Sequence, residues 1–384
     1  MKFLNFSKNV RLTGYCLLVL TYTIFNYTQL ASITKLGGFS NALRILVILI
    51  LIFGMFFQKY RFKELLIFSV IFLFSIFVGY KSDSLDLPMT VAVIFCMRKI
   101  EFVKIVRVDF YTRLIITIII FICAINNYIP SNNFFREGVM RYSFGFYHPN
   151  LFGAYMLILT LEFIYLGYIK SPKTARIWII LPVVFFIDKT ANSRSAEISL
   201  LIYLVAYLIF KFDFFGRISK KTLTFISVIM IGLASIISIV STYMYNPMNE
   251  MWVLINKLLS SRPALISSVV NNFYSIHLFG QRTPLLGDTE GTVVNGRNVS
   301  LFVDNSYMSI AIKFGSVALV LFVLWLIKNS LTFIRGKNRI IMFCWLLALL
   351  IWGLSENKLI LIQFNILLFS YVEKNEGEIT CKNI

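Results

Sequence analysis

The stretch RYSFGFYHPN, Arg141 to Asn150, leads directly into the apolar run LFGAYMLILTLEFIYLGY, residues 151–168. A run of this length with a single charged residue is typical of a helix that spans a membrane. Pro149 suits the first turn of such a helix, where it has no hydrogen bond to lose. The first turn also leaves free N–H groups that attract anions, so we expect Arg141 and His148 at an anion-binding helix end beside the lipid.

The composition extends this interpretation to the whole chain. Of the 384 residues, 58% are hydrophobic and only 14% are charged, and the mean hydropathy is +0.78. A soluble domain cannot bury that much apolar surface, and the alternation typical of a membrane β-barrel is missing. We therefore predict an all-α polytopic integral membrane protein, with one transmembrane domain over 1–372 and a short cytoplasmic tail over 373–384.

About twelve transmembrane helices are expected. They cover residues 12–33, 41–57, 65–80, 85–97, 114–130, 150–168, 176–191, 195–210, 222–242, 305–327, 340–355 and 357–371. With the N-terminus inside, most Lys and Arg residues, Arg113 among them, fall in cytoplasmic segments, as the positive-inside rule requires. Topology therefore accounts for most of the net charge of +19, and we expect no nucleic-acid partner.

One long extracytoplasmic loop, about 243–304, interrupts this pattern. Within it Ser261 is expected to cap a helix with Pro263 in its first turn. Apolar residues then recur at helical spacing, at Leu265, Ile266, Val269, Val270 and Phe273. We predict an amphipathic helix that could lie on the outer membrane surface, cover the mouth of a cavity or simply pack within the loop.

Missing motifs exclude several classes of enzyme. The chain has no Walker A loop, HExxH, GxSxG or dinucleotide-binding fingerprint, and no Asp-x-Asp pair to hold a metal with a nucleotide-sugar. Its five cysteines show no CxxC spacing, which argues against disulfide or metal roles. We expect no cofactor and no metal site.

Arginines on the outer side are the main candidates for binding. They are Arg136, Arg141, Arg194, Arg262, Arg282 and Arg297. Arginine binds phosphate with two parallel hydrogen bonds and keeps its charge when partly buried, so such a group suits a diphosphate headgroup. Scattered solvated charge is the alternative, and it is the better interpretation of Arg297. Glu197, three residues after Arg194, could pair with it on one helical face.

Histidines and carboxylates supply the candidate acid–base groups. His148 could act as an acid or base because the charge of histidine changes near neutral pH, or it could only form hydrogen bonds; His277 has the same two interpretations. Asp304, before Asn305, is a candidate base for a sugar hydroxyl and is equally plausible as a helix cap. Glu356 lies at the outer turn between the last two expected spans, where a carboxylate is costly unless it has a function.

Together these segments resemble the Wzy-type polysaccharide polymerases of the O-antigen polymerase and ligase family. The resemblance rests on Arg141-x3-Gly145-x2-His148-Pro149-Asn150, Ser193-Arg194-Ser195-Ala196, Arg262, Leu278-Phe-Gly280, Asp304-Asn305-Ser306-Tyr307, Lys313-Phe-Gly315 and Ser355-Glu356. Their order and topology match from about residue 110 to 360. Related ligases often carry histidine near the position of Asp304, so this departure favours a polymerase.

The resemblance implies a metal-independent glycosyltransferase. It would transfer a growing glycan from undecaprenyl diphosphate to a sugar hydroxyl of the next lipid-linked repeat unit, in capsule, exopolysaccharide or O-antigen synthesis. Catalytic roles are expected for Arg194, Arg262, Asp304 and His148, and substrate binding for Arg136, Arg141, Asn150, His277, Arg282, Asn305 and Glu356.

The same resemblance implies a multi-pass protein of the bacterial cell membrane, with the active site on its extracytoplasmic side. The expected partners are the undecaprenyl-diphosphate-linked oligosaccharide, membrane lipid, and flippase and chain-length regulator proteins. A glycan ligase of the same family is one alternative. A lipid-linked oligosaccharide flippase or another transporter is the alternative of a different class, and it should place ionisable groups near the bilayer midplane.

Overall fold

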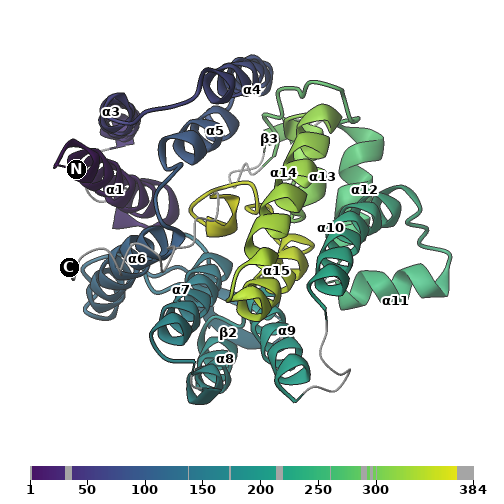
Figure 1. Ribbon diagram of the computed structural model, residues 1–384. Helices are drawn as coiled ribbons and strands as arrows, with labels where there is room; N and C mark the ends of the chain where they lie inside the picture. Colours follow the sequence, from purple (N-terminus) through teal and green to yellow (C-terminus); the bar gives the residue numbers. More distant parts are fainter. Residues whose placement is uncertain are drawn as a thin grey trace.

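The computed structural model describes residues 2–30, 37–136, 138–172, 174–212, 219–259, 261–286, 292–294, 297–299 and 301–369. In this part of the chain the fold is helical, with two short antiparallel hairpins, β1 (Asn133–Arg136) with β2 (Val139–Tyr142) and β3 (Thr292–Val294) with β4 (Arg297–Val299) (Figure 1). The expected tail, residues 373–384, lies outside the described residues.

Most helices follow one another with short connections, and the exceptions are the longer segments between α6 and α7 and between α12 and α13. They are α1 (Lys2–Tyr22), α3 (Gly37–Phe56), α4 (Phe62–Ser82), α5 (Asp86–Cys96), α6 (Phe102–Ile125), α7 (Pro149–Lys170), α8 (Ile180–Thr190), α9 (Arg194–Lys211), α10 (Lys220–Tyr243), α11 (Glu250–Leu258), α12 (Arg262–Asn272), α13 (Ser306–Lys313), α14 (Ser316–Arg335) and α15 (Arg339–Gly353). Short π- or 3-10-helical turns cover Thr23–Tyr27, Thr174–Ile179 and Ile366–Leu368.

Among the described helices, five are long and apolar enough to cross a membrane: α4, α6, α7, α10 and α14. The number rises to six if α11 and α12, which are bent by 109° at their junction, form one broken span. The all-α class is therefore confirmed and is consistent with a membrane protein. The larger number of twelve spans and the sidedness of the long loop stay predictions.

The centre of the bundle is built around α7 and α15. In α7, 72% of the most apolar window is buried, whereas only 17% of the corresponding window of α4 is buried, so α4 lies at the periphery. α15 packs against α9, and α7 packs between α6 and α9. Figure 1 shows the yellow C-terminal segment lying in the middle of the molecule, between α7 and α14.

This C-terminal segment corrects the last expected span. Residues 357–369 form turns and one short 3-10 helix rather than a long helix. Buried carbonyls that a helix would have satisfied instead accept side-chain hydrogen bonds: Asn329 Nδ2 donates to Leu367 O at 3.0 Å and Arg113 Nη2 to Gln363 O at 2.8 Å. Irregular backbone is tolerated within a membrane protein when the surrounding protein satisfies it in this way.

A buried ion pair corrects the placement of Arg113. This residue lies inside α6 and is fully buried, with its Nη2 atom 2.8 Å from Asp109 Oδ2, four residues earlier on the same helix. Tyr15 of α1 donates a hydrogen bond to Asp109 Oδ1 at 3.2 Å. Glu162 of α7 is also fully buried beside the pair. The charge of Arg113 is therefore stabilised by Asp109 and by the Gln363 carbonyl within the fold, and not by cytoplasmic water.

The amphipathic helix expected after Ser261 is present as α12. Ile266, Val269 and Val270 are buried in a small apolar cluster with Leu301 and other residues of the segment before α13, so this face packs on protein. The expected cap is wrong: Ser261 has a left-handed backbone, φ +64°, and its side chain makes no capping bond. Asn256 supplies the cap instead, because its Oδ1 accepts from Ala264 N at 3.0 Å.

Candidate functional site

The predicted helix starts at Pro149, but the N–H groups of its first turn, which were expected from the sequence to be free, have partners: Leu151 N donates to His148 O at 3.0 Å. His148 is the N-cap residue, and its Nδ1 accepts a hydrogen bond from Asn150 N at 3.1 Å. Pro149 occupies the first helical turn. Because Nδ1 accepts, the neutral ring carries its proton on Nε2. The His148 ring also packs against Phe134 of β1, with ring centroids 4.8 Å apart, so the histidine joins the hairpin to the start of α7.

Arg141 reaches the same helix end from β2. Its Nε donates to Ala191 O at 2.9 Å and its Nη2 donates to Asn150 Oδ1. The chain can turn from β2 into α7 because Gly145 adopts φ +82°, and a Cβ there would meet Ile129 at 2.6 Å. Sequence neighbours therefore place a buried guanidinium against the first turn of α7.

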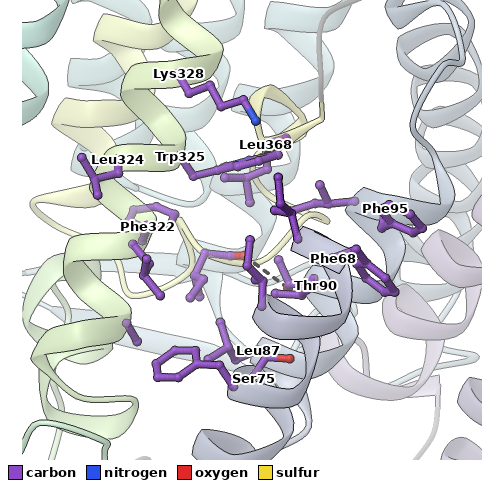
Figure 2. A pocket seen from close by; sticks show the side chains of 18 of the residues that line it. Phe68, Ser75, Leu87, Thr90, Phe95, Phe322, Leu324, Trp325, Lys328 and Leu368 are labelled. Atoms are coloured by element: carbon purple, nitrogen blue, oxygen red, sulfur yellow. Dashed lines mark hydrogen bonds between the residues drawn. The ribbon is translucent and has the colours of Figure 1, made fainter. Parts of the chain in front are cut away.

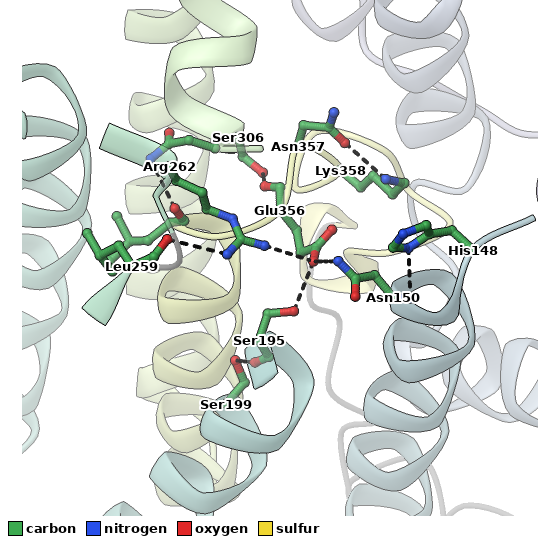
Figure 3. Close-up of polar contacts among 12 residues, drawn as sticks. His148, Asn150, Ser195, Ser199, Leu259, Arg262, Ser306, Glu356, Asn357 and Lys358 are labelled. Carbon is green, nitrogen blue, oxygen red and sulfur yellow. Dashed lines mark hydrogen bonds and ion pairs between the residues drawn. The ribbon is translucent and has the colours of Figure 1, made fainter. Parts of the chain in front are cut away.

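Glu356 is the centre of the polar cluster (Figure 3). Its Oε1 accepts hydrogen bonds from Ser195 Oγ at 2.9 Å and from Asn150 Nδ2 at 3.2 Å. Arg262 Nη2 lies 3.7 Å from the same oxygen. The Glu356 side chain is only 5% exposed. We call Glu356, Asn150, Ser195, Arg262 and Arg141 the Glu356 cluster.

The start of α13 holds the Glu356 loop in place. Ser306 Oγ donates to Glu356 O and accepts from Leu359 N at 3.0 Å. Asn305 Nδ2 donates to Leu354 O at 3.2 Å, while its Oδ1 accepts from Met308 N at 3.0 Å. Asn305 is therefore the helix cap, and the alternative that Asp304 caps this helix is wrong. The Asn305–Ser306 pair positions the carboxylate, a role that its sequence did not reveal.

Burial and neighbouring charges set the protonation of the cluster. Burial raises the pKa of Glu356, the positive charges of Lys358 and Arg262 oppose that rise, and Asp304 adds to it. Burial lowers the pKa of Arg141 to about 10, with repulsion from Arg136 as the next cause. Arg141 is thus charged at neutral pH, and Glu356 is a carboxyl that titrates above its ordinary range.

His148 behaves differently from the expectation. Burial, followed by repulsion from Arg141 and Lys358, lowers its pKa to about 4. The ring is therefore uncharged at neutral pH, and the expectation that its charge changes there is wrong for this environment.

A second group of arginines surrounds the turn before α9. Arg136 Nη2 donates to Asn192 Oδ1 at 2.9 Å, next to the carbonyl of Ala191 that Arg141 binds. Arg194 is the first residue of α9. The charges of Arg136, Arg141 and Arg194 all act on Glu197, in the first turn of that helix. Of the arginines singled out by sequence, Arg141 and Arg262 therefore belong to the Glu356 cluster. Arg136 and the exposed Arg194 are near enough for their charges to act on Arg141.

His277 and Arg282 do not join them. Both side chains are exposed, and the ring Nε2 of His277 lies 3.4 Å from Ser275 Oγ. The neighbouring motif has a structural role: Gly280 and Gly315 have φ of +78° and +93° and pack so closely that a Cβ on Gly280 would lie 2.5 Å from Lys313 O.

Two other charged residues from the sequence motifs are Lys313 and Asp304. Lys313 Nζ pairs with Asp86 Oδ2 at 3.2 Å, which ties α13 to the start of α5. Asp304 is partly buried, and its charge acts on Glu356.

Sequence reasoning assigned no role to Ser195 or Lys358. Their only signal was position, since Ser195 follows Arg194 at a helix start and Lys358 belongs to the polar run Ser355–Lys358 between apolar stretches.

The donor set of the site is one of arginines, amides and a carboxylate. Within the described ranges, no group of three or more His, Cys, Asp or Glu side chains is placed to hold a metal ion. Such an arrangement can bind an anionic group through its guanidinium forks and accept a proton at Glu356. No family model, curated protein or solved structure matches this chain.

Proposed function

We propose that this chain is a glycosyltransferase of the bacterial cell membrane that polymerises lipid-linked repeat units. The Glu356 cluster would face the extracytoplasmic side. The observation that carries the proposal is the convergence of Arg262, Asn150 and Ser195 on one carboxyl oxygen of Glu356. These residues come from different helices and one loop, so the fold, rather than local sequence, brings them together.

The arginines would bind the donor. Undecaprenyl diphosphate leaves with the electron pair of the sugar C1–O bond, and negative charge grows on its phosphates as that bond breaks. Guanidinium groups that are already in place stabilise such charge without reorganisation. Arg262 and Arg141 belong to the cluster, and the charge of the exposed Arg194 acts on Arg141. Several guanidinium groups suit a diphosphate, which has several oxygens to bind.

Glu356 would accept the proton of the attacking sugar hydroxyl. As the acceptor oxygen bonds to C1, its proton passes to the carboxylate, and Arg262 remains as the counter-charge. Burial raises the pKa of Glu356 toward working pH, which favours a general base. The base proposed here is therefore Glu356 and not Asp304, the base expected from sequence. The charge of Asp304 acts on the Glu356 carboxyl.

Reconstitution with a purified lipid-linked repeat unit tests the proposal. Wild-type protein should form a ladder of glycans without added nucleotide. Arg262→Ala should slow elongation by about a hundredfold or more, as loss of one preorganised donor does. Glu356→Gln, which keeps the shape and removes the base, should slow it by about a hundredfold to ten-thousandfold. Single lipid-linked repeats should accumulate in both cases.

A matched control is Lys257→Ala, which removes an exposed basic residue of α11 outside the cluster and should elongate at the wild-type rate. If Arg262→Ala and Glu356→Gln both make full-length polymer, the assignment is wrong. A glycan ligase would add preformed glycan once to a different acceptor. A transporter would make no ladder and, in cells, its loss would trap repeats on the cytoplasmic side.

A further inference from the structure

A cavity outside the Glu356 cluster lies between α4 and α5 on one side and α14 on the other (Figure 2). Its volume is about 300 Å³, at the lower end of the range for small-ligand sites. The walls are apolar, with Phe68, Phe95, Phe322 and Trp325 among them, and Leu368 of the C-terminal segment contributes as well. No lining residue belongs to the Glu356 cluster.

The cavity extends along the helices that line it. On α4 the lining runs from Glu64 to Ser75, and on α14 it runs from Ala318 to Lys328. At a rise of 1.5 Å per residue, each distance is roughly 15 Å. That length equals half of the hydrocarbon thickness of a bilayer, about 30 Å in total. The cavity therefore has the length of one leaflet.

Charge is confined to one end of the cavity. Figure 2 shows Lys328 at one end and Ser75 and Leu87 at the other. Arg98 and Glu64 line the Lys328 end, where Arg98 Nη2 lies 3.2 Å and Lys99 Nζ 3.5 Å from the Glu64 carboxylate. Two cations, Arg98 and Lys99, thus share the Glu64 carboxylate, and Lys328 adds a positive charge near Arg98, so this end carries a net positive charge.

We propose that this cavity binds an anionic phospholipid, with one hydrocarbon chain along the groove and the phosphate between Arg98 and Lys328. The apolar wall of one-leaflet length matches the chain, and the surplus of positive charge matches the headgroup. Arg98 would bind the phosphate with its fork, and Lys328, whose Nζ lies 4.7 Å from the Trp325 ring centroid, would close over it.

The test is native mass spectrometry of the full chain released from detergent, with phosphatidylglycerol and phosphatidylcholine of identical chains as probes. Wild type should retain phosphatidylglycerol in preference. Arg98→Gln and Lys328→Gln should each weaken that preference by about fivefold. Leu321→Trp, which fills the groove and leaves both cations, should abolish retention of both lipids at this site. Lys221→Gln, an exposed basic residue of α10, is the control and should behave like wild type.

Melting temperatures confirm that each variant is folded. Equal retention of the two lipids by wild type, or unchanged retention in Leu321→Trp, would overturn the proposal. So would displacement of the lipid by inorganic phosphate alone, because that result assigns the site to free phosphate. Glycan elongation is a separate readout, so failure here does not decide the polymerase proposal.

Discussion

His148 lies where a positive charge is disfavoured. Its ring packs on Phe134 and its Nδ1 accepts from Asn150 N. Three nearby cations oppose its protonation: Arg141, Lys358 and Arg136. In the folded protein its pKa is about 4, whereas in the unfolded chain it takes the ordinary value near 6.5. Below pH 6.5 the unfolded chain therefore binds a proton that the folded protein does not.

This difference predicts a pH-dependent stability. The contribution of His148 is fully present above pH 6.5 and is lost as pH falls from 6.5 to about 4, by at most about 3 kcal/mol. Thermal melting of detergent-solubilised protein across that interval should show a steeper loss in wild type than in His148→Asn, which keeps a capping side chain but cannot ionise. Parallel curves for the two proteins would mean that His148 is accessible to protons in the folded state.

Residues that are close in sequence were predictable, and those that meet through the fold were not. The capped helix start from His148 to Asn150 follows from local rules. The sequence did not indicate that Asn150 connects Arg141 with Glu356, because that contact joins α7 to a loop about two hundred residues later. Side-chain type and expected topology were enough to select Glu356 as a candidate, but they could not show that Glu356 contacts Arg262.

At the scale of elements, the N-terminal cap of α12 comes from the neighbouring helix α11 and not from the residue next to α12 in the sequence. Ser261 precedes Pro263 as a cap residue should, yet its left-handed backbone turns the side chain away. The sharp bend between α11 and α12 brings Asn256 to the open N–H groups of α12. Sequence spacing cannot predict a cap that depends on a bend.

Two substitutions separate the contributions of Asn256 and Ser261 to the stability of the protein. Asn256→Ala should destabilise the protein by about 1 kcal/mol, as loss of a helix cap does. Ser261→Gly should stabilise it by about 1 kcal/mol, because only glycine adopts a left-handed backbone without cost. Melting temperatures provide the comparison, with Ser261→Ala as the reference. A larger loss in Ser261→Ala than in Asn256→Ala would identify Ser261 as the true cap.

At the scale of the whole molecule, the irregular segment 357–369 is the main departure from the sequence. Its apolar composition predicted a spanning helix, but composition cannot show which side chains will receive its carbonyls. Trp325 Nε1 donates to Leu368 O at 2.8 Å and Thr90 Oγ1 to Ile360 O at 3.3 Å, in addition to the bonds from Asn329 and Arg113. The fold closes around this segment, which links α5, α6 and α14.

Substitutions of Asp109 and Arg113 test how much this buried ion pair stabilises the packing around segment 357–369. Arg113→Ala should destabilise the protein by about 3 to 5 kcal/mol, because it leaves Asp109 as an uncompensated buried charge. The double variant Asp109→Leu, Arg113→Met removes both charges and should recover most of that loss. Unfolding in detergent measures both. If the double variant is as unstable as the single one, the hydrogen bond to Gln363 O, rather than the balance of charge, is the main contribution of Arg113.

Glu356 is also the last residue of its cluster to be synthesised by the ribosome. Arg141, Ser195 and Arg262 all enter the nascent chain first, and a product that stops after α15 would hold the arginines without the carboxylate that they meet in the folded protein. On the proposed function, such a product would lack the base for a sugar hydroxyl. We therefore expect glycan elongation, if this proposal holds, to begin only once the segment that carries Glu356 has been synthesised and folded into the centre.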